Sequence, residues 1–185
     1  MDLVLLKPGN VDVAEEFLSL IEYDFEDGTT LSGCIELVSC NFGMSQQMTT
    51  DVSNQARTSG RPNLNDITVV KYLDFSSPVM YRHCLSATPI DTGEEDEPTR
   101  IYLCRNANQA GEENVIAPIV QISLWNCMIS SVQAQSHPND MATEQFTLNY
   151  TDIEWTSVHQ GVDANAGGNV SYKWSVARNR QTVSG

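Results

Sequence analysis

Few residues in this 185-residue chain could transfer protons or act as nucleophiles, and their spacing does not bring them together. The histidines His83, His137 and His159 are isolated in the sequence. His83 and Cys84 are adjacent, but neighbouring residues on a helix point in different directions. No H-E-x-x-H, G-x-S-x-G or phosphate-binding glycine loop occurs. The sequence therefore predicts that the protein is not an enzyme. A cysteine nucleophile paired with a distant histidine stays open as an alternative.

Metal and cofactor sites have no better support. Zinc requires clustered cysteine or histidine, and the five cysteines are spread out with no C-x-x-C pair. Residues 163–168 match the start of a calcium loop, but its twelfth position is Trp174, where a bidentate glutamate is required. A glycine-rich hairpin turn is the better interpretation of this segment. We expect no cofactor and no metal, and mostly buried free thiols rather than disulfides.

The elements that would position any site are mostly strands. Val170, Tyr172, Trp174 and Val176 alternate with polar residues, a period of two that is typical of a half-buried strand. Similar patterns predict strands at residues 2–7, 34–42, 64–73, 100–105, 115–133, 143–156 and 169–177. Within 143–156 the apolar parity changes after Tyr150, which predicts a β-bulge there. The pattern predicts a mainly β protein, with residues 1–185 forming a single domain.

One short helix is expected among these strands. Ser77 can cap its N-terminus, and Pro78 suits the first helical position. A weaker helical pattern covers residues 14–23, where Phe17 begins an i, i+3, i+4 apolar stripe. The predicted apolar side of the first helix consists of Met80, Tyr81, Cys84 and Leu85.

Trp125 stands apart from the other two tryptophans. Trp155 and Trp174 share the parity of their apolar neighbours, which favours core packing. Trp125 has the opposite parity to Ile122 and Leu124 in the long segment 115–133. A large aromatic residue on the second face of a strand predicts that this face is also covered, either by the helix or by another subunit. Trp125 is therefore a candidate subunit-interface residue.

The charge of the chain excludes several classes of partner. Ten basic residues stand against 24 acidic ones, which gives a formal net charge of -14. This charge disfavours nucleic acid and anionic membranes as partners. No apolar run approaches the roughly 18 residues of a membrane helix, and the N-terminus lacks the pattern of a secretory signal. We expect a cytoplasmic chain without membrane insertion, in which the acidic segments 12–27 and 91–97 form solvated loops.

Five segments, in order along the chain, carry more specific motifs. They are IELVSCNFGMSQ at 35–46, DITVVKYLD at 66–74 before a Ser-Ser-Pro turn, ISSV at 129–132, residues 143–150, and GGNV at 167–170 followed by Trp174. Together they resemble the haemolysin-coregulated protein (Hcp) family, the tube protein of bacterial type VI secretion. The segments 9–33 and 88–98 are longer and more acidic than expected for that family.

The resemblance implies a fold and a structural function. The fold would be two packed antiparallel sheets forming a compact β-barrel with one short α-helix, similar to phage tail tubes. Copies would close into hexameric rings that stack into the inner tube and carry effector proteins in the channel. The implied partners are further copies of the chain, effectors, the spike protein at the tube tip and the contractile sheath. The protein would be secreted from the cytoplasm, to the extracellular space or a target cell, without a signal peptide.

The resemblance also implies roles for particular residues. Asn41, before the aromatic-glycine pair, would face the channel and help to hold cargo, together with Ser39, Gly43 and Ser45. The alternative interpretation is that these four are simply small residues beside a turn. The segment 46–61 matches an extended loop that contacts the next ring or a neighbouring subunit, so Asn54, Arg57 and Arg61 are candidate contact residues, the two arginines for acidic partners.

Two alternatives to the type VI tube stay open from the sequence. The first is the tail-tube protein of a phage or of another contractile injection particle, which would share the fold and the ring. The second is a monomeric cytosolic β-sandwich binding module, which requires only the fold class.

Overall fold

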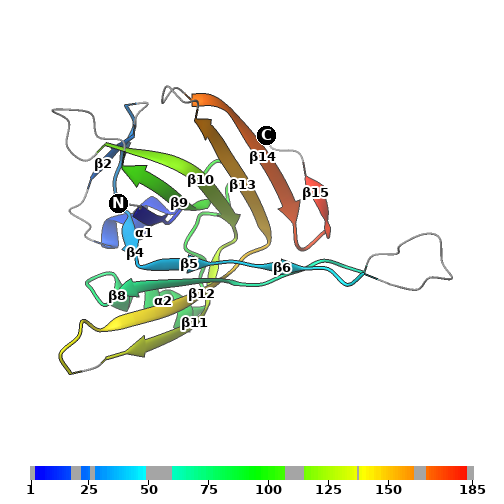
Figure 1. The fold of residues 1–185 in the computed structure, drawn as a ribbon. Coiled ribbons are helices and arrows are strands. Elements are labelled where there is room, and N and C mark those ends of the chain that lie inside the picture. The colour runs from blue at the N-terminus through cyan, green and yellow to red at the C-terminus, as the bar shows by residue number, and fades with distance from the viewer. Residues whose placement is uncertain are drawn as a thin grey trace, which may run out of the picture.

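The computed structural model describes residues 3–17, 22–25, 28–48, 60–106, 115–136, 138–160 and 166–182, and these ranges are mainly β (Figure 1). Along the chain the elements are β1 (Leu3–Lys7), α1 (Val11–Glu16), β2 (Tyr23–Phe25), β3 (Thr30–Leu31), β4 (Ile35–Leu37), β5 (Ser39–Asn41), β6 (Met44–Ser45), β7 (Asn63–Leu64), β8 (Ile67–Tyr72), α2 (Ser77–Ser86), β9 (Thr99–Asn106), β10 (Val115–Trp125), β11 (Met128–Gln135), β12 (Thr143–Asn149), β13 (Asp152–Gln160), β14 (Ala166–Ser175) and β15 (Arg180–Thr182).

The strands form two packed sheets and one ribbon. The large sheet has the order β15-β14-β13-β10-β9-β1-β4, and β2 and β3 are attached to it through a parallel pairing of β2 with β10. The four-stranded sheet has the order β11-β12-β8-β5, and β6 pairs with β7 alone. The predicted mainly β class with two antiparallel sheets is confirmed. Within the described ranges, no strand pairing joins the two sheets into a closed barrel.

The core lies between the two sheets and follows the predicted alternation. Ile67 and Val69 of β8 and Phe146 of β12 are fully buried on the inner face of the four-stranded sheet. They belong to one apolar cluster with residues of the large sheet, among them Ile101, Ile122, Leu124 and Ile153. Each such side chain contributes about 1.5–3 kcal/mol on burial, so this interface holds the two sheets together.

Three segments predicted as single strands are each divided between the two sheets. Segment 115–133 is broken at Asn126, which has φ 50°, so β10 belongs to the large sheet and β11 to the other. Segment 143–156 contains no bulge, because Tyr150 and Thr151 separate β12 from β13. Segment 34–42 changes sheet at Val38, whose N–H donates to the carbonyl of Val70. In segments 34–42 and 143–156 a change of apolar parity marks the change of sheet, since each sheet turns a different side towards the core, whereas segment 115–133 changes sheet without such a signal.

Helix α2 forms where it was predicted, but two details differ. Ser76 is the N-cap residue, while Ser77 lies in the first turn and is buried. Leu85 is 88% exposed, so its prediction as an apolar-side residue was wrong. The buried row of the helix is Ser77, Met80 and His83, and this i, i+3 spacing turns Leu85 to solvent.

A second helix, α1, corrects the prediction of a single helix. It spans Val11–Glu16 rather than residues 14–23, and the side chain of Asn10 accepts a hydrogen bond from the N–H of Asp12 at its start. Tyr23 belongs to strand β2, and residues 18–21 lie outside the described ranges. Neither helix is long and apolar enough to cross a membrane, among the residues described.

The acidic turn at 91–97 is only partly a solvated loop. Asp91 is 3% exposed, and its carboxylate accepts hydrogen bonds from the N–H groups of Cys127 and Gly93. The N–H of Ile90 donates to the carbonyl of Cys127 in the same place. Asp91 therefore fixes the corner where the chain passes from the large sheet to the four-stranded sheet.

Candidate functional site

The outer face of the four-stranded sheet, which points away from the core, carries seven uncharged polar residues and Val70. Strand register places two rows across it: Ser39, Val70, Gln145 and Gln133 form one row, and Asn41, Thr68, Thr147 and Ser131 form the other. We call these eight residues the polar face. Ser39 and Asn41 are exposed, and both belong to edge strand β5.

The polar face contains no lysine, arginine, aspartate or glutamate, although the chain has a net charge of -14. The hydroxyl groups of this face form hydrogen bonds with one another and with the neighbouring Ser130. Ser131 and Thr147 are joined through their hydroxyls at 2.6 Å, and Thr147 also contacts the hydroxyl of Ser130 at 2.8 Å. A hollow of about 390 Å³ lies between the ends of β8, β11 and β12, lined by Val70, Gln133 and Gln145 among others. This surface can form hydrogen bonds with a partner but offers no charge.

The other two candidate channel residues lie beyond the sheet, in an arm formed by residues 42–48 and 60–65 around β6 and β7. The carbonyl of Gly43 accepts a hydrogen bond from the N–H of Asn65, and Ser45 pairs with Asn63. Figure 1 shows this arm projecting from the end of β5 and β8. The structure thus brings Ser39 and Asn41 together on the sheet and places Gly43 and Ser45 further along the same hairpin. Their channel-facing role stays a prediction.

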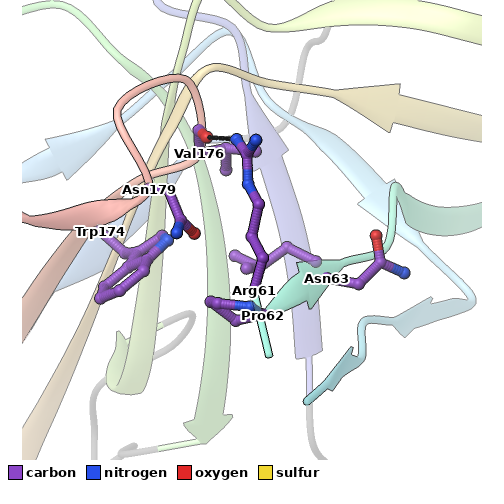
Figure 2. Close-up of a pocket in the computed structure, with 7 residues that line it drawn as sticks. Arg61, Pro62, Asn63, Trp174, Val176 and Asn179 are labelled. Carbon is purple, nitrogen blue, oxygen red and sulfur yellow. Dashed lines mark hydrogen bonds between the residues drawn. The ribbon is translucent and has the colours of Figure 1, made fainter. Parts of the chain in front are cut away.

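Arg61 lies beyond β7, towards the outer end of the described arm, and connects the arm to the large sheet. One of its guanidinium nitrogens donates to the carbonyl of Val176 at 3.1 Å, as the dashed line in Figure 2 shows. A pocket of about 250 Å³ opens beside it, lined by Arg61, Pro62, Asn63, Leu64, Trp174, Val176 and Asn179. The other two predicted contact residues, Asn54 and Arg57, lie outside the described residues.

The second face of β10, where Trp125 lies, is covered by the same chain. The Nζ of Lys173 lies 3.9 Å from the centre of the Trp125 ring, and the indole N–H donates to the carbonyl of Glu95 at 3.0 Å. Within one chain, the contacts with Lys173 and Glu95 thus cover part of the Trp125 ring. A subunit contact at the remaining exposed edge of this ring stays a prediction.

Sequence reasoning missed a buried ionic network beneath the polar face. Lys71 and Glu144 are directly opposite one another on β8 and β12, and both side chains are fully buried with 2.9 Å between Nζ and Oε1. Lys71 also contacts Asp74 at 2.6 Å. Glu144 accepts hydrogen bonds from the hydroxyls of Ser77 and Tyr81 on α2. The network fastens α2 to the inner face of the four-stranded sheet.

The sequence did contain a signal for this network. Lys71 follows Ile67 and Val69 at two-residue spacing, and Glu144 precedes Phe146 and Leu148 in the same way. A charged residue at a core-facing position needs an opposite charge, because an unpaired buried charge is costly. A core-facing lysine on one strand and a core-facing glutamate on a neighbouring strand could therefore have been predicted to form an ion pair.

The described cysteines and histidines show no catalytic arrangement. All five cysteines are free, and three of them are buried. Burial raises the pKa of Cys34 and of Cys40 to about 11, so these thiols are protonated and poorly nucleophilic at neutral pH. The Nδ1 of the buried His83 contacts the hydroxyl of Thr88 within α2's C-terminal turn. Among the residues that the structure describes, no group of three or more potential ligands could hold a metal ion.

Raised tyrosine pKa values predict a loss of stability at alkaline pH. Burial raises the pKa of Tyr102 and of Tyr150 to about 12, whereas an unfolded tyrosine loses its proton near its ordinary value of 10. Between these values the folded chain binds more protons than the unfolded chain, so rising pH favours unfolding. The free energy of unfolding, measured by urea titration, should therefore fall as the pH rises from 10 towards 12. A constant or increasing value across this window would contradict the assignment.

The fold and the sequence both match known proteins. A family model described as the type VI secretion system effector, Hcp, matches residues 27–157. The protein Hcp1 of Pseudomonas aeruginosa is 30% identical over 121 residues, which cover 64% of this chain and 68% of the relative.

Solved structures extend the match to nearly the whole chain at the level of the fold. A structure described as that of a type six secretion system protein has a TM-score of 0.72 at 16% identity, and covers 98% of this chain and 100% of its own. Hcp1 from Salmonella typhimurium has a TM-score of 0.63 at 14% identity, and covers 98% of this chain and 99% of its own. The family model spans more than half of the chain, and the structural matches agree with it, so the chain belongs to the Hcp family of type VI secretion system proteins.

Proposed function

We propose that this protein is a structural component of the type VI secretion inner tube, in which hexameric rings stack and carry effector proteins through a central channel. The polar face lines that channel, with Ser39 and Asn41 exposed to cargo. The partners are further copies of the chain, effectors, the spike protein at the tube tip and the contractile sheath. The protein leaves the cytoplasm through the tube.

The observation that carries the proposal is the chemistry of the polar face. The inner face of the four-stranded sheet is buried against α2 and the large sheet, so only the outer face is free to meet a partner or a channel. Hydroxyl and amide groups without charge form hydrogen bonds with many protein surfaces and repel neither acidic nor basic ones. Such a wall suits a channel that passes several different effectors.

The arm supports the assembly part of the proposal. It carries exposed apolar side chains, with Met44 58% and Met48 55% exposed, at a place where the described part of the chain does not cover them. Methionine adapts to irregular partner surfaces and is common at binding interfaces. The predicted contact residues Asn54 and Arg57 fall in the segment between the two described halves of the arm. Contact with a neighbouring subunit or the next ring would cover this apolar surface.

Light scattering after size-exclusion chromatography, combined with negative-stain images, tests the proposal on the full chain. We expect particles of about six times the 20.5 kDa mass of the chain, seen as rings with an open centre. A monodisperse monomer over the whole concentration range would contradict the ring and favour a monomeric binding module. Rings of a different subunit number would contradict the hexamer.

A further inference from the structure

Three basic side chains gather at one corner of the molecule, which we call the basic corner. Arg178 lies in the turn between β14 and β15, Arg180 begins β15, and Arg61 is tied to Val176 just before that turn. All three residues are exposed, in a chain that has only ten basic residues. None of the three guanidinium groups has a carboxylate within 4.0 Å among the residues the structure describes.

The pocket at this corner has one charged residue in its lining, Arg61, together with the amide side chains of Asn63 and Asn179. Figure 2 shows the guanidinium of Arg61 and the side chains of Asn179 and Trp174 around it. The indole N–H of Trp174 is fully buried, so an incoming group cannot reach it. The guanidinium and the two amide groups offer hydrogen-bond donors, which fits an acceptor-rich, negatively charged group such as a carboxylate.

Acidic side chains lie at the opposite edge of the large sheet. β15 is one edge of this sheet, and β1, which leads directly into α1, lies five strands away, or about 24 Å at the usual strand spacing. We call Asp12, Glu15 and Glu16 of α1 the acidic edge; all three are exposed. Glu16 is paired with Arg82 at 2.6 Å, whereas the carboxylates of Asp12 and Glu15 have no partner among the described residues. Figure 1 places α1 and β15 on opposite sides of the molecule.

We propose that the basic corner of one copy binds the acidic edge of the next copy, so that a carboxylate from α1 enters the pocket beside Arg61 and Trp174. Two different complementary patches on opposite edges of one chain define a head-to-tail contact, and such contacts close into rings. Opposite charges across an interface also fix its register and disfavour wrong pairings. This inference rests on the ring of the proposed function and names the surfaces that form it.

Charge reversal on each side of the contact tests the pairing. The variant with Arg178→Glu and Arg180→Glu has acidic groups on both sides of each contact, and the variant with Asp12→Lys and Glu15→Lys has basic groups on both sides. Like charges at an interface cost several kcal/mol, so each variant alone should lose rings, with a ring fraction at least about tenfold below that of the unmodified chain. An equimolar mixture should restore rings, because alternating copies present opposite charges at every contact and an even number of copies closes.

Light scattering of the two variants and of their mixture, with the unmodified chain alongside, decides the inference. Rings from both single variants, or no recovery on mixing, would overturn the pairing while rings of the unmodified chain still support the proposed function. Absence of rings from the unmodified chain would instead contradict the proposed function itself. Recovery on mixing also shows that both variants are folded, because an unfolded chain cannot complete a ring.

A matched pair controls for net charge. The variant with Arg178→Gln and Arg180→Gln has the same net charge as one with Leu85→Glu and Ser86→Glu, two exposed positions on the last turn of α2. We expect the first variant to weaken ring formation and the second to leave it unchanged. Equal weakening in both would assign the effect to overall repulsion and overturn the specific contact.

Discussion

Replacing Lys71 by methionine is expected to lower the free energy of unfolding by about 3–5 kcal/mol, the usual cost of leaving a buried charge without its partner. Lys71 and Glu144 are both fully buried, and their charged atoms are 2.9 Å apart. Without the ammonium group, Glu144 keeps only the hydroxyls of Ser77 and Tyr81 as partners. Because these hydroxyls belong to α2, loosening of the helix should accompany the loss of stability. Urea unfolding followed by tryptophan fluorescence measures the effect.

Two further variants separate the buried pair from a general effect of losing a lysine. Lys71→Met combined with Glu144→Leu removes both charges. We expect this double variant to recover part of the lost stability, since the core tolerates an apolar pair of similar volume in place of the ion pair. Lys173→Met removes the 3.5 Å pair with Glu95, whose side chain is 73% exposed, together with the ammonium 3.9 Å from the Trp125 ring centre, and should cost about 1–2 kcal/mol, less than Lys71→Met. A double variant no more stable than Lys71→Met alone would contradict the account of this network.

Replacing Asp91 by alanine should lower the free energy of unfolding by about 1–3 kcal/mol, the cost of a buried N–H without an acceptor. The carboxylate of Asp91 accepts the buried N–H of Cys127 and also the N–H of Gly93, an exposed residue whose N–H can bond to water instead. Both groups belong to the corner at which the chain changes sheet. Burial raises the pKa of Asp91, and the hydrogen bonds from the N–H groups of Cys127 and Gly93 oppose that rise. Thermal and urea unfolding of Asp91→Ala measure the loss.

The neighbouring acidic residues provide the comparison for Asp91. Asp91→Asn keeps an acceptor oxygen at the same place, so its loss should be smaller than that of the alanine variant. Glu94→Ala changes an exposed side chain of the same turn and should stay within about 0.5 kcal/mol of the unmodified chain. Similar losses in Glu94→Ala and Asp91→Ala would show that the turn responds as a whole and that the buried carboxylate has no special role.

Period-two alternation allowed the strands to be predicted, because local spacing alone decides which side of a strand meets the core. The division of segment 115–133 at Asn126 could not be predicted in the same way. Both halves are apolar on one side, and the corner depends on hydrogen bonds to Asp91, which is far away in the sequence. Long apolar segments of this kind look continuous until their partner strands are known.

The surfaces proposed for assembly depend even more on tertiary structure. Arg61 and Arg178 are more than a hundred positions apart in the sequence, and only the docking of the arm against Val176 brings them together. The spacing of these arginines in the sequence does not indicate that they lie close together. Trp125 did give a pattern, because its position opposite to the apolar side of the strand indicated that this second face is covered. The pattern could not distinguish cover by a side chain of the same chain, such as Lys173, from cover by a neighbouring subunit.

An electron cryomicroscopy reconstruction of the purified, unmodified assembly tests the central claim most directly. The account predicts a six-membered ring in which β5, β8, β12 and β11 surround the opening, with Ser39 and Asn41 directed towards the axis and α2 behind them. A ring whose opening is lined by the large sheet or by α2 would contradict the account, as would a preparation that contains single copies only.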